Sequence, residues 1–143
     1  MTAYRDANLS LPTRKTGGSA GYDIAAADNV RLYAGQVSLI PTGLKAFMPA
    51  DEYLGIFIRS GLSIRNCLSL INGQGIIDAD YYNNPGNEGH IIIAVFNHGR
   101  EAVDIAKGVR VAQGIFQRYF TTAEETETEG MVIRTGGFGS TGE

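Results

Sequence analysis

The feature that most restricts the fold is that the apolar residues of this chain come in short segments separated by turn residues. No segment keeps a helical apolar period for more than about two turns, and some alternate with period two. Glycine, proline and asparagine fill the gaps. Many short strands between regularly placed turns are typical of an all-β sandwich, barrel or jelly roll. The segments are residues 22–24, 30–33, 37–44, 53–58, 67–71, 75–77, 91–96, 102–105 and 109–120.

One stretch favours a helix instead of a strand. Residues 60–66 fit one or two helical turns, with Ser60 as the expected N-cap.

The longest apolar stretches, such as 91–96, have about six residues, whereas a membrane span needs roughly 20. The first residues have no apolar signal region. The sequence therefore predicts a cytoplasmic protein with no membrane contact.

The C-terminal residues differ in composition from the rest. We expect a β-barrel domain over residues 1–120 and a linker with a glycine-rich arm over 121–143. Residues 121–130 hold four glutamates and almost no apolar side chain, which is typical of a solvated linker. In residues 134–142, glycine N–H groups, hydroxyls and an arginine are groups that contact phosphate oxygens. We therefore predict a flexible arm that closes over a phosphorylated ligand, in preference to a tail without function.

Charge and metal-binding residues exclude several classes of protein. The net charge of −3 argues against a nucleic-acid binder that follows phosphates with a basic face. The single cysteine, Cys67, rules out an intrachain disulfide, and we expect it to be a small buried hydrophobe. His90 and His98 have no partners at zinc-ligand spacing, so both are expected at the surface.

Polar residues that could bind a ligand occur within or directly after two of the apolar segments. Asp23 lies inside an apolar strand next to glycine, where a carboxylate either caps a backbone N–H or lies near a hydrated cation. Residues 59–61 (Arg-Ser-Gly) end a strong apolar strand and bring together a guanidinium, a hydroxyl and an open backbone N–H. These groups form a small anion site at a strand-to-helix turn.

Residues 72–81 predict a strand, a tight turn and a second strand, forming a hairpin whose tip exposes backbone donors and acceptors. Asp78 is a candidate general base in a partly apolar pocket. Asp80 would point to the opposite face of an extended strand, so we expect it to be structural. Residues 107–113 add Arg110 and Gln113 beside apolar core positions.

Together these segments resemble the five motifs of the trimeric dUTPases, in the family's order and at about its spacing. The matching segments are residues 20–23, 59–61, 75–81, 108–113 and 136–142, and the resemblance covers residues 8–142. It implies a jelly-roll β-barrel that assembles as a homotrimer with active sites at the subunit interfaces. The implied reaction is the Mg²⁺-dependent hydrolysis of dUTP to dUMP and pyrophosphate, which keeps uracil out of DNA and supplies dUMP for dTMP synthesis.

The resemblance also implies a role for particular residues. Asp78 would activate the water that attacks the α-phosphate, and Tyr81 would pack under the deoxyribose and exclude a 2′-hydroxyl. Asp23 and Gln113 would act on Mg²⁺ through water, with no direct protein ligand. Implied uracil contacts are Asn72, Ile76, Ile77, Ile92 and the stacking Phe138, and implied phosphate contacts are Arg59, Ser60, Gly61, Gln113, Arg134, Gly139, Ser140 and Thr141.

In the implied assembly each active site takes the hairpin from one chain, the first, second and fourth motifs from another, and the arm from the third.

The sequence departs from the family pattern in four places. Ile58 replaces a proline, and Val109 replaces an acidic residue that would pair with Arg110. The 82–89 stretch is longer than the common form, and Arg134 stands four residues before Phe138 where five are usual.

Two alternatives remain open. A dCTP deaminase would share the fold and the trimer, but it needs a catalytic glutamate in the base pocket, and only Glu88 lies near the third motif. A non-catalytic nucleotide-binding regulatory module would be expected to lack Asp78 or the arm, and both are present. Whether the protein has a regulatory protein partner is not decided by the sequence.

Overall fold

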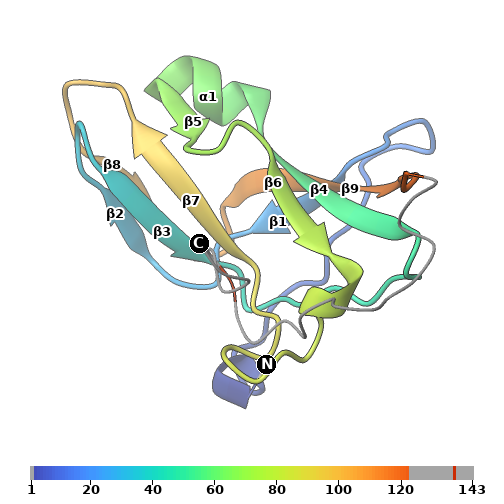
Figure 1. The fold of residues 1–143 in the computed structure, drawn as a ribbon. Coiled ribbons are helices and arrows are strands. Elements are labelled where there is room, and N and C mark those ends of the chain that lie inside the picture. Colours follow the sequence, from blue (N-terminus) through green and yellow to red (C-terminus); the bar gives the residue numbers. More distant parts are fainter. Residues whose placement is uncertain (1, 123–136, 138–143) are drawn as a thin grey trace.

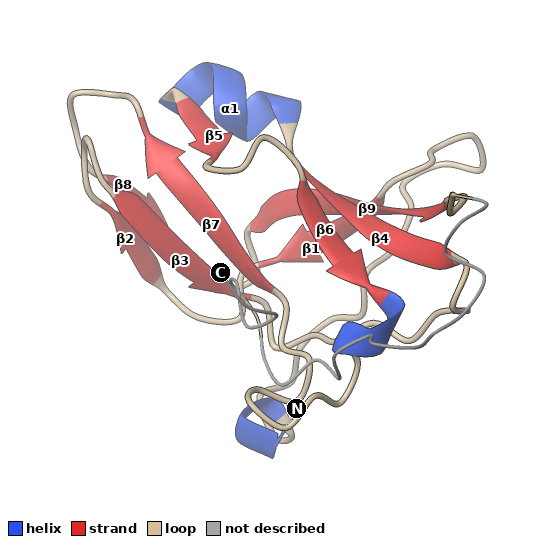
Figure 2. Ribbon diagram, in the orientation of Figure 1, coloured by secondary structure: helices blue, strands red, loops and turns tan. Residues whose placement is uncertain are grey.

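The computed structural model describes residues 2–122 and 137, and in these residues β-strands dominate, as predicted (Figure 2). Every apolar segment of the sequence contains one strand, and the helix predicted for residues 60–66 is present. The elements are η1 (Thr2–Tyr4), β1 (Tyr22–Ala25), β2 (Val30–Leu32), β3 (Val37–Pro41), β4 (Glu52–Ile58), α1 (Ser60–Asn66), β5 (Leu68–Leu70), β6 (Gly75–Asp78), η2 (Ala79–Tyr81), β7 (Ile92–Asn97), β8 (Val103–Ile105) and β9 (Arg110–Arg118).

The strands form three antiparallel sheets that share one core. Their orders are β1-β9-β4-β6, β3-β7-β5 and β2-β8. Figure 1 shows the four-stranded sheet on one side, the other two sheets opposite it, and α1 at one end. Side chains from all three sheets, such as Ile24, Leu32 and Val95, join in one buried apolar cluster. Among the described residues no helix is long and apolar enough to cross a membrane.

The pairing predicted around residues 72–81 is wrong, although both strands exist. β5 pairs with β7, whereas β6 pairs with β4, so the turn between β5 and β6 crosses from one sheet to another. Gly73 has a φ of 71° in this turn. Apolar alternation predicts where a strand forms, but the partner of a strand depends on distant segments that bury the same side chains. A hairpin was therefore the simplest pairing but not the observed one.

Both ends of α1 differ from the expectation. Arg59, not Ser60, is the N-cap, and it makes no side-chain capping bond. The helix ends at Cys67, which has a left-handed backbone (φ 52°, ψ 43°) and donates its N–H to the carbonyl of Ser63. Cys67 is exposed, so the expected burial is wrong. The left-handed cap turns this side chain away from the core before β5 begins at Leu68.

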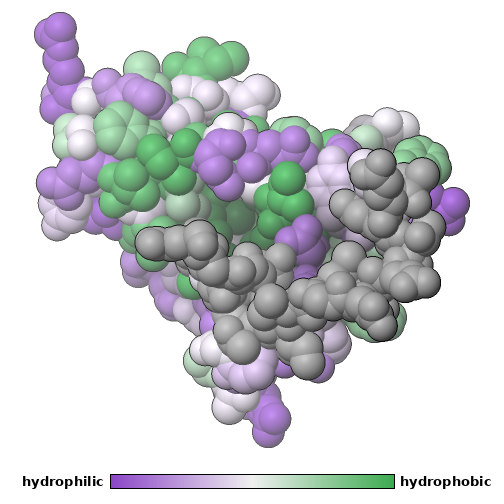
Figure 3. All heavy atoms as spheres, in the orientation of Figure 1, coloured by the Kyte–Doolittle hydropathy of each residue, from purple (hydrophilic) through white to green (hydrophobic). Residues whose placement is uncertain are grey.

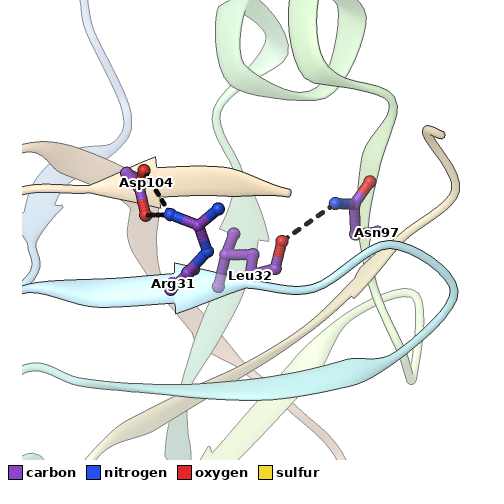
Figure 4. Close-up of polar contacts among 4 residues, drawn as sticks. All are labelled: Arg31, Leu32, Asn97 and Asp104. Carbon is purple, nitrogen blue, oxygen red and sulfur yellow. Dashed lines mark hydrogen bonds and ion pairs between the residues drawn. The ribbon is translucent and has the colours of Figure 1, made fainter. Parts of the chain in front are cut away.

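A single buried amide ties two of the sheets together. Asn97, at the end of β7, is fully buried, and its Nδ2 donates to the carbonyl of Leu32 at 3.1 Å (Figure 4). The same Nδ2 donates to the carbonyl of Glu101 at 2.9 Å. Its Oδ1 accepts the N–H of Gly99 at 2.8 Å. The amide thus satisfies three backbone groups that would otherwise lack these partners.

We expect Asn97→Ala to lower the free energy of unfolding by about 3 kcal/mol, because each buried polar group left without a partner costs about 1–3 kcal/mol. Urea denaturation measures the change. Arg31→Ala is the control, since Arg31 pairs with Asp104 at 3.0 Å but both side chains are more than half exposed. Such a pair contributes at most about 1 kcal/mol. Equal urea midpoints for Asn97→Ala and the wild type would contradict the assigned role.

The N-terminal segment packs over His90, which is only 9% exposed, so the prediction of a surface position is wrong for this histidine. The ring of Tyr4 lies 5.3 Å from the His90 ring, and the N–H of Gly43 donates to His90 Nε2 at 3.0 Å. His98 is exposed, as predicted. Because Nε2 of His90 accepts a hydrogen bond, the neutral ring is the form that fits this site.

His90 makes stability depend on pH. Burial lowers the pKa of His90 below its ordinary value of 6.5, against the opposing effect of Asp28 and Glu88. The unfolded chain therefore binds more protons than the folded chain below about pH 6.5. We expect this contribution to stability to be complete above pH 6.5 and to be lost as the pH falls through the folded-state pKa. Urea midpoints between pH 5 and 8 should show a smaller pH dependence for His90→Gln, whereas His98→Gln should follow the wild type.

Candidate active site

The first site cluster is built on the pairing of β1 with β9. Asp23 lies directly opposite Gln113 in this ladder, which places both side chains on one face of the sheet. Arg59 follows β4, and its Nε lies 3.0 Å from Asp23 Oδ1. Arg110 Nη1 lies 2.7 Å from Asp23 Oδ2. The Asp23 side chain is 12% exposed, against 35% and 40% for the two arginines, so a largely buried carboxylate holds two outward-reaching guanidiniums.

This geometry shows partners for both Asp23 and Arg110. Asp23 pairs with Arg59 and Arg110, a role in addition to the two expected ones, a backbone cap or a carboxylate beside a cation. Val109 offers no carboxylate to Arg110, but Arg110 pairs with Asp23 across the sheet. Sequence spacing did not indicate this pair, which joins residues 87 positions apart.

A cavity of about 440 Å³ opens beside the cluster. Gly21 leaves room for the Gln113 side chain, since a Cβ at residue 21 would lie 2.6 Å from Gln113 Oε1. The only carboxylate among the described lining residues is Asp23, which already pairs with arginines, so the cavity favours an anion. The lining comprises the predicted Gly21, Asp23, Arg59, Ser60, Gly61 and Gln113, together with Lys15, Ser19 and Arg65, which the sequence analysis missed.

A helical signal could have identified one of these missed residues. Arg65 stands four positions after Gly61 on α1, and residues at this spacing share a helix face. The guanidinium of Arg65 passes close to Gly61, where a Cβ would lie 3.2 Å from Nη2. Lys15 and Ser19 belong to a polar loop whose path no local pattern predicts.

A second cavity, of about 260 Å³, lies between the sheets at β6. β6 is the edge strand of the four-stranded sheet, and an edge strand presents backbone N–H and C=O groups that no neighbouring strand of its sheet uses. The space-filling view shows polar and apolar side chains together on this face (Figure 3). The lining includes the predicted Asn72, Ile76, Ile77, Asp78, Tyr81 and Ile92, with Ile56, Leu70, Gly75, Ile93, Ala94 and Gly137.

The two aspartates of this region have different surroundings, although residues 79–81 form η2 and not the extended strand assumed for Asp80. Asp78 ends β6 opposite Tyr53 and lines the cavity. Asp80 lies in η2, is exposed, and is not among the described residues that line the cavity. Glu88 is also outside this lining, and its carboxylate accepts the N–H of Thr2 at 3.0 Å. Asp78 is therefore the carboxylate placed to act on a ligand bound beside β6.

Tyr81 closes one side of the second cavity. Its side chain is 7% exposed, and its hydroxyl donates to the carbonyl of His90 at 3.0 Å. Gly137 lies against it, because a Cβ at residue 137 would be 2.7 Å from Tyr81 Oη. One residue of the C-terminal arm therefore contacts the pocket of its own chain. The other predicted arm residues, Arg134, Phe138, Gly139, Ser140 and Thr141, lie outside the described residues.

The two cavities share no lining residue in the described part of the chain. The cavity at β6, called the base cavity below, has the size, apolar walls and edge-strand backbone suited to a planar base. The cavity beside Asp23 and Arg59, called the anion cavity, has the charge suited to phosphates. Residues 2–122 contain no group of three or more His, Cys, Asp or Glu side chains that could hold a metal ion.

Comparison with known proteins gives one family. The dUTPase family model matches residues 7–142. A deoxyuridine 5′-triphosphate nucleotidohydrolase of Lactococcus lactis subsp. lactis is 49% identical over 142 residues, covering 99% of this chain and 94% of the relative. The crystal structure of dUTPase from Streptococcus mutans superposes with a TM-score of 0.81 at 44% identity, covering 85% of this chain and 94% of the other. A Staphylococcus bacteriophage 80alpha dUTPase mutant with dUpNHpp has a TM-score of 0.71 at 25% identity, covering 95% and 94%.

Proposed function

The chain belongs to the dUTPase family, and we propose that it hydrolyses dUTP to dUMP and pyrophosphate with Asp78 as the general base. The observation that carries this proposal is the cavity beside β6, where the carboxylate of Asp78, an edge-strand backbone and the buried ring of Tyr81 meet. Each of these features suits one part of a deoxyuridine nucleotide.

Uracil would pair with the backbone of Ile76, Ile77 and Asp78 and with the side chain of Asn72. A base held edge-on by main-chain groups has no room for the methyl group of thymine. Cytosine presents donors where uracil presents acceptors, so its binding would leave polar groups unpaired. Ile92, across the cavity from β6, would complete the contact with the base.

The deoxyribose would lie against Tyr81, whose ring is held from behind by the bond from its hydroxyl to His90. A ring that cannot withdraw leaves no space for a 2′-hydroxyl. This contact would therefore discriminate dUTP from UTP by steric exclusion.

The phosphates would lie in the cavity lined by Arg59, Ser60, Gly61 and Gln113. Asp23 would keep the Arg59 guanidinium oriented toward them, because its carboxylate contacts Arg59 Nε at 3.0 Å. Arg134 and residues 139–141 would add donors from the arm. Mg²⁺ binds triphosphates readily while it keeps several waters, and it would neutralise charge on the phosphates. Gln113 and the remaining lone pairs of Asp23 would contact those waters.

In the chemical step, Asp78 would accept a proton from a water molecule as the water oxygen attacks the α-phosphorus. The bond between the α-phosphorus and the bridging oxygen to the β-phosphorus would break, and pyrophosphate would leave with the electron pair. Phosphoryl transfer needs alignment and charge neutralisation more than covalent catalysis, and the arginines with backbone N–H groups would supply that neutralisation.

Hydrolysis in H₂¹⁸O tests this mechanism. We expect the ¹⁸O label in dUMP and none in pyrophosphate, as measured by mass spectrometry. Label in pyrophosphate would place the attack at the β-phosphorus and would remove the assigned geometry of Asp78.

We further propose that the enzyme acts as a homotrimer, in which a base cavity of one chain faces an anion cavity of another. The separation of the two cavities in a single chain supports this arrangement. The arm would come from the third chain, although Gly137 contacts Tyr81 of its own chain in the single protomer.

Subunit mixing distinguishes an exchanged arm from one that serves its own chain. Asp78→Asn chains retain the arm, and chains lacking residues 131–143 retain Asp78. After the two proteins are unfolded and refolded together, we expect activity to return to a sizeable fraction of the wild-type value, because mixed trimers contain sites with both parts. If the arm serves only its own chain, the mixture will be as inactive as its components.

A further inference from the structure

The loop formed by residues 82–89 holds Tyr81 at both ends. Asn87 Nδ2 donates to Tyr81 Oη at 2.7 Å, and Asn84 Nδ2 donates to the Tyr81 carbonyl at 2.9 Å. This loop is the stretch that is longer than the common family form. Through Asn84 and Asn87 the loop contacts Tyr81, which lines the base cavity.

The hydrogen bonds fix which way the Asn87 amide points. Its Oδ1 accepts from Asn84 Nδ2 at 2.8 Å and from the N–H of Gly89 at 3.1 Å. Since the oxygen faces these two donors, the Nδ2 group faces Tyr81. The Tyr81 hydroxyl then accepts from Asn87 and sends its own proton to the His90 carbonyl at 3.0 Å. The phenol is thereby held from two directions.

Hydrogen bonds within the loop that carries Asn87 constrain its conformation. Asn84 is 5% exposed, and its Oδ1 accepts the N–H groups of Gly86 (3.0 Å) and Asn87 (3.1 Å). Gly89 has a φ of 79°, and a Cβ there would lie 2.6 Å from the Tyr81 carbonyl oxygen. Only glycine fits this position without strain. A loop so constrained can hold the amide of Asn87 at one distance from the phenol.

We propose that Asn87 is a positioning residue that sets how far the Tyr81 ring reaches into the base cavity, and thereby determines the preference for deoxyribose over ribose. The inference rests on the proposed function, in which Tyr81 lies against the sugar. Discrimination against a single hydroxyl by steric exclusion requires that the excluding group stay in place to within a fraction of an ångström. Without the Asn87 amide, the phenol loses one of the two hydrogen bonds described here, and the ring can tilt away from a 2′-hydroxyl.

The test compares Asn87→Ala, Tyr81→Phe and the double variant with the wild type. Two quantities are measured: the ratio of kcat/KM for dUTP to that for UTP, and the ratio of the Kd for α,β-imido-UTP to the Kd for α,β-imido-dUTP. We expect Asn87→Ala to lower both ratios about tenfold, and Tyr81→Phe, which also loses the bond to His90, to lower them at least as much. The double variant should lower them no further than Tyr81→Phe, because Tyr81→Phe already removes the hydrogen bond that Asn87 makes. Asn83→Gly is the control, since Asn83 lies in the same loop with a φ of 59° that glycine adopts readily, and its ratios should match the wild type.

Unchanged ratios in Asn87→Ala would overturn the proposal, and so would a further tenfold loss when Asn87→Ala is added to Tyr81→Phe. If thermal unfolding shows that Asn87→Ala does not fold, Tyr81→Phe decides the question alone, because it keeps every loop residue; unchanged ratios in this variant overturn the proposal. A wild-type enzyme that hydrolyses UTP as well as dUTP contradicts the proposed function itself, and it is recognised before any substitution is made.

Discussion

Asp78→Asn is expected to lower kcat for dUTP by about 10²–10⁴-fold, the usual contribution of general acid–base catalysis. Asparagine keeps the shape of the side chain but cannot accept the proton of the attacking water. The side chain lines the base cavity at the end of β6, and the substitution leaves the backbone that would bind uracil unchanged. We therefore expect the Kd for α,β-imido-dUTP to stay within about threefold of the wild-type value, while turnover falls. Steady-state kinetics with pyrophosphate detection measures the first quantity, and calorimetry measures the second.

Asp80→Asn is the matched control for this experiment. Asp80 is two residues away, is exposed, and lies outside the lining of the base cavity. Its replacement should leave kcat within about twofold of the wild type. Near-normal turnover of Asp78→Asn, or an equal loss in both variants, would remove Asp78 from the mechanism.

Removal of residues 131–143 is expected to lower turnover by at least 10²-fold while the fold persists. Among residues 2–122 and 137, the buried core consists of side chains between Ile24 and Ala112. The arm carries Arg134, Phe138 and a run of glycine N–H groups, and the loss of donors that stabilise charge in a transition state costs about 10²–10³-fold for each donor. The melting temperature of the shortened chain should remain within a few degrees of the wild-type value.

Removal of Glu143 alone is the control for the shortened chain, because this residue lies beyond the glycine-rich segment. It should leave turnover unchanged. Full activity without residues 131–143 would exclude the arm from the site, and a large fall in melting temperature would show that the arm belongs to the folded core.

The positions of the strands and of the helix could be predicted from the sequence, because local residue patterns determine them. Apolar alternation and turn residues located the nine strands of residues 2–122 to within a few residues, because a strand that buries one face needs this pattern wherever its partner lies. Helix α1 was located over the predicted residues 60–66, although its N-cap is Arg59 and not Ser60. Asp78 and Tyr81 were assigned through the resemblance to a family, and the structure places them in one cavity.

Other features of the fold and the site could not be predicted, because they depend on contacts between residues far apart in the sequence. Asp23 could be recognised as important, but its ion pairs with Arg59 and Arg110 follow from the order of β1, β9 and β4 in the sheet. His90 is buried because the N-terminal segment folds over it, which no local pattern indicates. Asn87 lies in a stretch that the sequence indicates only as a longer loop. Its contact with Tyr81 depends on how this loop folds back, which no local pattern predicts.

The measurement that tests the central claim most directly is product release from four nucleotides by the full-length enzyme with Mg²⁺. Pyrophosphate and ammonia are followed for dUTP, dCTP, dTTP and UTP under the same conditions. We expect pyrophosphate from dUTP, with kcat/KM values at least 10²-fold lower for the other three and no ammonia from dCTP, because the cavity beside β6 would select both the base and the sugar. Ammonia from dCTP, or equal pyrophosphate release from dUTP and dTTP, would contradict this account.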